Sequence, residues 1–267
     1  MKKQSLIKQR LTGWSMALAA AATLGMVSGG AQAIPAGWTC AGTCGTLGPD
    51  GVVTAPPGGV SYDYISTAGA VGGNGASLGL GSETNGSSLA SSVFHAKVGD
   101  KLEFAFNYVT SDGSGFADYA WARLQDVTTN TLVGYLVTAR TKPSGSIIPG
   151  QGMPSIIAGL TPASVPIIGG GPAWSPLGGC SGTCFSGPAN GCGYTGWVLS
   201  DYTIAAEDDY KLEFGVINSI DTAFQSGLAI SGATIGGQVI GVPEPGTVAL
   251  LGLALAGIGF IGRRRKQ

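Results

Sequence analysis

Glycine and proline set the strongest limit on what this chain can fold into. Its 267 residues include 47 glycines and 14 prolines. Both residues disfavour helix interiors, glycine through its backbone entropy and proline through its missing N–H group. The chain therefore favours short strands joined by turns over long helices.

Several apolar runs between these turns alternate with polar residues. In residues 101–108 (KLEFAFNY) and 211–216 (KLEFGV), apolar side chains occupy every second position, which is the period of a strand with one buried face. Further strands are expected at residues 59–66, 91–98, 118–127, 131–139, 196–204 and 228–235. We predict an all-β fold, an antiparallel jelly-roll-like sandwich with long Gly/Pro-rich loops.

Two segments refine this prediction. Residues 141–193 combine many glycines and prolines with little alternation, so we expect long loops laid over the sandwich. The Lys-Leu-Glu-Phe sequences that begin at Lys101 and Lys211 each lead into a polar turn. We expect those two turns at the same edge of the sandwich.

Charge divides the chain into three parts. Eight of the 14 basic residues lie near the two ends, whereas residues 34–241 hold fourteen acidic and six basic residues. An acidic middle argues against nucleic acid as a partner, because phosphate recognition needs clustered Lys and Arg.

The N-terminal residues 1–33 have the features of a signal peptide. A basic start precedes an apolar run from Trp14 to Val27, and the small residues Ala31 and Ala33 flank Gln32 as in a cleavage site. A membrane-spanning first helix is the alternative, but the apolar run is short for a span. We expect export and cleavage by signal peptidase, with Ile34 as the first mature residue.

The C-terminal residues 242–267 contain three features in a fixed order. They are the extended tetrapeptide Val242, Pro243, Glu244 and Pro245, an uncharged stretch at 246–262, and the basic cluster Arg263, Arg264, Arg265 and Lys266. Seventeen uncharged residues are close to the minimum for a membrane-spanning helix, and the positive cluster is expected on the cytoplasmic side. An ordinary tail anchor is the alternative interpretation.

This tail resembles the PEP-CTERM sorting signal of Gram-negative bacteria. The resemblance implies an exosortase-type processing enzyme as partner, transit through the inner membrane, and delivery to the cell surface or extracellular matrix in hosts that make exopolysaccharide. The tail need not persist in the mature protein. The expected organisation is a signal peptide at 1–33, an extracellular β-sandwich at 34–241 and the sorting signal at 242–267.

The middle of the chain also resembles one uncharacterised family of PEP-CTERM proteins. The resemblance is carried by residues 38–45 (WTCAGTCG), 107–120 (NYVTSDGSGFADYA) and 227–230 (GLAI). It implies a sandwich-like cargo and no known activity.

Five cysteines suggest disulfides, because an exported chain matures in an oxidising compartment. Four fall in similar pentapeptides, which suggests the pairs Cys40–Cys44 and Cys180–Cys184. Alternatively, Cys192 pairs with Cys180 or Cys184. The odd number leaves one thiol free or paired between molecules.

Oxygen-rich loops give one candidate metal site. Asp112 and Asp118 flank a glycine-rich loop, and Asp221 joins them if the two Lys-Leu-Glu-Phe segments are adjacent. Calcium takes six to eight oxygen ligands, so these residues are the calcium candidates, although aspartate is also common in turns for local hydrogen bonding. No other cofactor is suggested.

Catalytic signals are weak. His95 is the only histidine, and no Gly-x-Ser-x-Gly elbow accompanies it. Nothing in the sequence singles out a facing pair of carboxylates for glycoside hydrolysis. We therefore predict no catalytic residues and a non-enzymatic protein, with a secreted hydrolase as the least favoured alternative.

Aromatic residues offer a sugar-binding alternative. Trp174 and Tyr194 occur in loop-like sequence and could stack against a carbohydrate ring. The sequence thus predicts an exported surface protein associated with exopolysaccharide, with a carbohydrate- or calcium-binding module as the alternative.

Overall fold

The computed structural model describes residues 34–142, 145–185 and 191–241. The expected signal peptide at 1–33 and the expected sorting tail at 242–267, each with its helix, lie outside these residues and stay sequence-based predictions. Within the described residues, no helix is long and apolar enough to cross a membrane.

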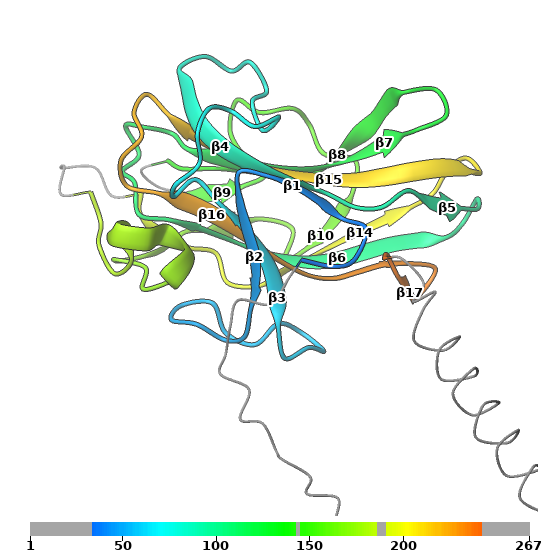
Figure 1. Ribbon diagram of the computed structural model, residues 1–267, viewed down its shortest axis with the longest axis horizontal. Coiled ribbons are helices and arrows are strands. Elements are labelled where there is room, and N and C mark those ends of the chain that lie inside the picture. The colour runs from blue at the N-terminus through cyan, green and yellow to red at the C-terminus, as the bar shows by residue number, and fades with distance from the viewer. Residues whose placement is uncertain (1–33, 143–144, 186–190, 242–267) are drawn as a thin grey trace, which may run out of the picture. The chain divides into compact units, whose positions relative to one another are not determined.

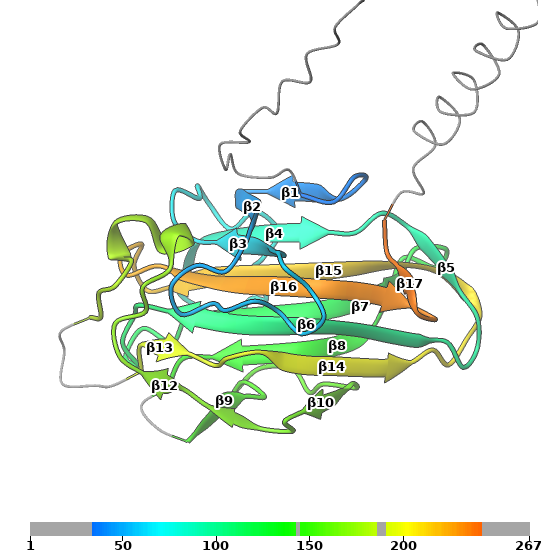
Figure 2. The same cartoon turned by 90° about the horizontal axis from the view of Figure 1, so that it is seen from below.

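One sheet, called sheet A here, has two ten-residue strands near its centre. Its order is β10 (Gly159–Thr161), β14 (Val198–Thr203), β6 (Lys101–Thr110), β16 (Ser226–Ile235), β3 (Tyr62–Ser66) and β2 (Thr43–Leu47). Three short strands join its margins: β12 (Ile168–Gly169), β13 (Gly193–Tyr194) and β17 (Gln238–Val239). Figure 2 shows β3, β16, β6 and β14 side by side.

The second sheet, called sheet B, packs against sheet A (Figure 1). Its order is β1 (Thr39–Ala41), β4 (Glu83–Ala90), β15 (Asp208–Ser219), β7 (Tyr119–Asp126) and β8 (Thr131–Arg140), and β5 (Phe94–Ala96) also pairs with β15. A separate pair joins β9 (Ser146–Ile148) to β11 (Val165–Pro166). All of these strand pairs are antiparallel, which confirms the predicted all-β antiparallel class.

Apolar side chains from the two sheets meet in one core. Phe104 on β6 contacts Phe214 on β15 edge to face, with ring centroids 5.3 Å apart. Trp38 stacks on the same Phe214 ring at 6.1 Å. Because successive strand residues point to opposite faces, the alternation of residues 101–108 and 211–216 places the two phenylalanine rings on the inner side.

The outer face of each sheet is also partly covered. Trp174, just before the short 3₁₀-helix η1 (Ser175–Cys180), lies on sheet A, and Trp121 lies within sheet B on its outer side. Each indole covers a glycine, because a Cβ atom at Gly227 would stand 2.5 Å from Trp174 and one at Gly215 would stand 2.4 Å from Trp121. Glycine is therefore required where each tryptophan approaches the backbone.

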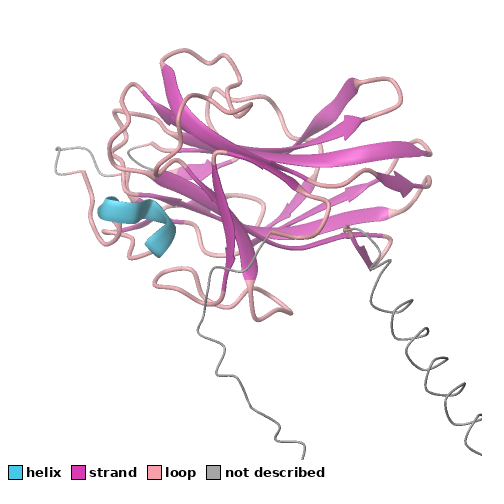
Figure 3. Cartoon of the chain, viewed as in Figure 1, coloured by secondary structure: helices cyan, strands magenta, loops and turns pink. Residues whose placement is uncertain are grey.

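The long apolar strands lie where alternation in the sequence predicts them, whereas the polar strands do not. The sequence does not predict strand β4, because ETNGSSLA has Thr84 as its one β-branched residue and is mostly polar, and the strand expected at 91–98 is limited to β5. Residues 141–193 contain short strands and η1 in addition to loops (Figure 3).

The two Lys-Leu-Glu-Phe segments lie in opposite sheets, on β6 and β15. The turns that follow them lie at one end of the sandwich, where the Ser219 N–H group donates to Asp118 Oδ1 at 2.8 Å.

Candidate functional site

The three aspartates predicted as calcium ligands lie at this end of the sandwich. Asp118 is fully buried; its Oδ1 accepts a hydrogen bond from the Ser219 N–H group at 2.8 Å, and its Oδ2 accepts one from Ser226 Oγ at 2.6 Å. Asp112 is buried beside it, and its Oδ2 has no hydrogen-bond partner among the described residues.

Burial controls the protonation of this cluster. Desolvation raises the pKa of Asp112 to about 7, and the charge of Asp221 adds to the shift. Desolvation likewise raises the pKa of Asp118 well above its usual value, although hydrogen bonds from Ser226 and Ser219 oppose the shift. Removing a carboxylate from water disfavours its charged form, so Asp112 and Asp118 keep their protons to a higher pH than an exposed aspartate does.

A metal site requires several ligand groups around one point. Among the described residues, no group of three or more His, Cys, Asp or Glu side chains is placed to hold a metal ion. Asp112, Asp118 and Asp221 thus lie at one end of the fold without forming a ligand cluster of that kind. Calcium binding by these residues stays a prediction.

His95 is exposed on β5 and contacts two carboxylates. Its Nδ1 lies 3.0 Å from Asp209 Oδ1, and its Nε2 lies 3.3 Å from Glu207 Oε1. Hydrogen bonding to Asp209, and then to Glu207, raises the pKa of His95. Both ring nitrogens thus face carboxylates, whereas the base of a serine hydrolase has one nitrogen directed at a serine hydroxyl.

The cysteines form two disulfides, and one predicted pairing is wrong. Cys40 pairs with Cys44 as predicted, but Cys184 pairs with Cys192 and leaves Cys180 as a half-buried free thiol. Cys180 ends η1, and its carbonyl oxygen accepts hydrogen bonds from the backbone and side chain of Thr183. The sequence offered Cys180 or Cys184 as alternative partners of Cys192, and Cys184 is the partner in the structure.

Trp174 cannot serve as the predicted stacking surface, because it is fully buried. Its indole N–H group donates to the Tyr62 hydroxyl at 2.9 Å, and its ring covers Gly227. Tyr194 is partly buried on β13 and packs against the apolar cluster that contains Trp174 and Tyr62. The prediction that Trp174 stacks on a ligand is therefore wrong, whereas Tyr194 keeps part of its side chain accessible.

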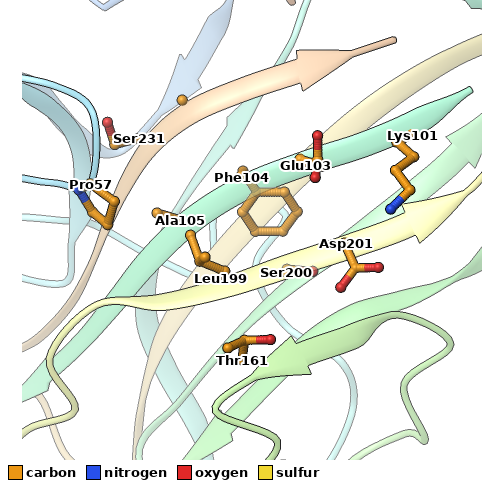
Figure 4. A pocket seen from close by; sticks show the side chains of 11 residues that line it. Pro57, Lys101, Glu103, Phe104, Ala105, Thr161, Leu199, Ser200, Asp201 and Ser231 are labelled. Carbon is orange, nitrogen blue, oxygen red and sulfur yellow. The ribbon is translucent and has the colours of Figure 1, made fainter. Parts of the chain in front are cut away.

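A cleft of about 330 Å³ opens on the outer face of sheet A. Strands β6, β14, β16 and β10 form its floor and walls, together with the loop that carries Pro57. Figure 4 shows Lys101, Glu103 and Asp201 at one end of the cleft and Pro57, Ala105 and Leu199 at the other. The hydroxyl-bearing residues Thr161 and Ser231 complete the rim.

The charged end of the cleft contains two acidic residues on neighbouring strands. Glu103 and Asp201 are direct cross-strand partners in the β6–β14 register. Within the described residues, neither carboxylate has a hydrogen-bond or ion-pair partner. Like charges directly opposite one another destabilise a sheet, so the pair does not contribute to the stability of the fold.

Sheet B supplies an informative contrast. Glu213 holds the same place in its Lys-Leu-Glu-Phe segment as Glu103, and its cross-strand partner on β7 is Arg123. Glu213 Oε2 accepts a hydrogen bond from Arg123 Nε at 2.8 Å. The glutamate of sheet B is therefore neutralised, whereas that of sheet A is left facing another acid.

Sequence reasoning missed this cleft, although alternation along residues 101–108 already placed Glu103 on the outer face. The sequence does not reveal the register that places Asp201 opposite Glu103, because β6 and β14 are far apart along the chain.

Comparison with known proteins identifies the tail rather than the cargo. Residues 241–266 match the PEP-CTERM protein-sorting motif, which implies export, sorting to the cell surface and processing by an exosortase-type enzyme. None of the curated proteins is similar to the chain in sequence.

Two solved structures have a partial likeness to the cargo, the K1 and K3 cleaved adhesin domains of Lys-gingipain from Porphyromonas gingivalis W83. The K1 domain has 12% identity and a TM-score of 0.33, over 75% of this chain and 94% of that domain. The K3 domain has 12% identity and a TM-score of 0.30, over 74% and 94% respectively. At such scores the likeness does not bear on activity.

Proposed function

We propose that this chain is a non-enzymatic protein of the cell surface or extracellular matrix of a Gram-negative bacterium, associated with exopolysaccharide. The PEP-CTERM motif at residues 241–266 carries this proposal, because it links the chain to an exosortase-type route. On that route residues 1–33 are removed by signal peptidase, and residues 242–267 hold the protein at the inner membrane until processing. Residues 34–241 are the delivered cargo.

The surroundings of His95 and of the buried Asp118 support a non-enzymatic cargo. His95 is held between two carboxylates on an exposed strand. Asp118 is enclosed by its own hydrogen-bond donors and has no contact with solvent. The excess of acidic residues in the cargo argues against nucleic acid as a partner.

The strand connections support the finer assignment of a jelly-roll-like sandwich. Neighbouring strands come from distant parts of the chain, as with β4 beside β15 and β6 beside β16. Such pairings require long connections between the sheets rather than simple hairpins.

A carbohydrate-binding module is the second candidate function, and the cleft on the outer face of sheet A favours it.

Calcium binding by Asp112, Asp118 and Asp221 is the alternative function for the end of the sandwich where these residues lie. Titration of the protein with calcium chloride tests it directly. Heat release that disappears in Asp118→Asn would support that alternative.

Fractionation of the native host tests the sorting route. Intact-mass analysis of the surface and matrix fractions is expected to find a chain that begins at Ile34 and lacks the segment after the Val242–Pro245 motif. A variant with Arg263, Arg264 and Arg265 replaced by glutamine is expected to accumulate unprocessed. Recovery of the native protein with its tail intact in the inner membrane would instead establish a tail anchor.

A further inference from the structure

We infer that the cleft on the outer face of sheet A binds a sugar residue that carries no negative charge. This inference rests on the proposed function and names the chemistry by which the cargo would meet an exopolysaccharide. It uses a different surface from Trp174 and Tyr194, the aromatic residues that the sequence suggested.

The charges of the cleft favour hydroxyl groups as the ligand's contacts. An ionised carboxylate only accepts hydrogen bonds, and Glu103 and Asp201 lie side by side without donors of their own. Vicinal hydroxyl groups of a sugar could donate to both carboxylates at once, and hydrogen bonds to charged acceptors are stronger than neutral ones. Lys101, on the same face of β6 as Glu103, adds a donor for a ring or glycosidic oxygen.

The other end of the cleft suits the carbon-bound face of a sugar ring. Leu199 is 45% exposed on β14, and Pro57 and Ala105 lie beside it in Figure 4, so the three side chains form a small apolar surface within the cleft. A sugar ring presents C–H groups on one face and hydroxyl groups at its edge. The cleft offers the complementary arrangement, an apolar end and a charged end within one concave surface.

Size and charge narrow the ligand further. A volume of about 330 Å³ lies at the lower end of the range of small-molecule sites, which fits one or two sugar units of a longer chain. Two carboxylates against one ammonium group leave the cleft negative, and the cargo as a whole is acidic. Uronate and sulfate groups would be repelled, so a neutral or amino sugar is the class that fits.

A fold-only account of the Glu103–Asp201 pair predicts a different result. If the pair served the fold, its neutralisation would lower stability. Since like charges oppose each other across the strands, Glu103→Gln and Asp201→Asn are expected to leave the melting temperature unchanged or to raise it. Loss of binding without loss of stability would then assign the pair to a ligand.

Calorimetric titration of the exported, processed protein tests the inference. The probes are glucose oligomers, glucosamine oligomers, oligogalacturonate and calcium chloride alone. Glucose or glucosamine oligomers are expected to bind, and Asp201→Asn or Glu103→Gln to weaken that binding at least tenfold. Leu199→Ala is expected to weaken it several-fold, whereas Leu132→Ala, a matched leucine 46% exposed on sheet B, leaves it unchanged.

Three outcomes would overturn the inference: no binding of either uncharged or amino-sugar oligomer, preference for oligogalacturonate, or sugar binding that appears only with calcium. Release of new reducing ends from a bound oligomer would leave the cleft as a sugar site but remove the non-enzymatic assignment.

Matrix retention in the native host separates this inference from the proposed function. The proposed function fails if the native protein is absent from the surface and matrix fractions. The cleft inference fails if the native protein is retained there and the Glu103→Gln/Asp201→Asn double variant is retained equally well. Glu207→Gln, an exposed acid outside the cleft, serves as the matched charge control.

Discussion

Phe104 and Phe214 meet edge to face between the two sheets, with ring centroids 5.3 Å apart and an angle of 88° between the rings. Each is the last residue of a Lys-Leu-Glu-Phe segment. The same four-residue pattern therefore provides the centre of both sheets, with its phenylalanine inward and its glutamate outward. The two outward glutamates have different neighbours, Arg123 for Glu213 and Asp201 for Glu103.

Truncating either ring should destabilise the fold strongly. Phe104→Ala and Phe214→Ala are each expected to lower the free energy of unfolding by about 3–5 kcal/mol, because each leaves a cavity in the core. A double-mutant cycle by urea denaturation should give a coupling energy of about 0.5–1.5 kcal/mol beyond burial. Additive losses would mean that the rings do not support one another; Leu132→Ala, on the surface, provides the baseline.

The two tryptophan–glycine contacts should not tolerate a methyl group. Gly215→Ala and Gly227→Ala are each expected to cost about 1–3 kcal/mol, because the new Cβ atom overlaps Trp121 or Trp174. Tryptophan fluorescence should report the displaced indole. Gly115→Ala is the control, since a Cβ atom there has no neighbour within 4 Å; an equal effect at that site would attribute the loss to the backbone alone.

The buried acid cluster should make the protein less stable as pH rises. Asp112 has a pKa of about 7 in the folded state, above its usual value near 3.8, so its stabilising effect is complete at low pH and is lost between these two values. The loss is at most roughly 4–5 kcal/mol. Chemical denaturation from pH 4 to 8 should show this slope.

Asp112→Asn should flatten part of that pH dependence. The pH dependence of stability that remains in this variant is expected to come from the neighbouring Asp118, whose pKa burial also raises. Asp126→Asn, at the end of β7 where the carboxylate accepts a hydrogen bond from the Thr129 N–H group, is the control for removing an aspartate outside the buried cluster. An unchanged slope in Asp112→Asn would show that Asp112 is ionised throughout this range.

The native protein should contain two disulfides and one thiol. Alkylation of the unfolded, non-reduced chain is expected to label Cys180 alone, and peptide mapping to find Cys184 joined to Cys192. Cys180→Ser should abolish the label and leave stability nearly unchanged. A Cys180–Cys184 peptide would contradict this connectivity.

Sequence patterns predicted what depends on neighbouring residues. Strands β6 and β15 follow from alternation, and the Cys40–Cys44 disulfide follows from close spacing in an oxidising compartment. These features depend on a few adjacent positions, which the sequence displays directly.

Features that depend on distant partners were not predictable in the same way. Trp174 has a loop-like sequence, and only the absence of a side chain at Gly227 makes room for it on sheet A. Strand β4 is too polar to be recognised alone, and β15 holds it through an antiparallel register. The Glu103–Asp201 pair likewise exists only through the register of β6 with β14.

The alternation along β6 and β14 has an evolutionary consequence. Glu103 and Leu199 project outward, while the residues next to them along the chain, Phe104 and Ser200, are buried. Substitutions that retune the outer positions leave the interior packing intact, so selection can act on the two sides of one strand independently. A lineage could thereby change the chemistry of the cleft through a few point substitutions, with the same interior packing.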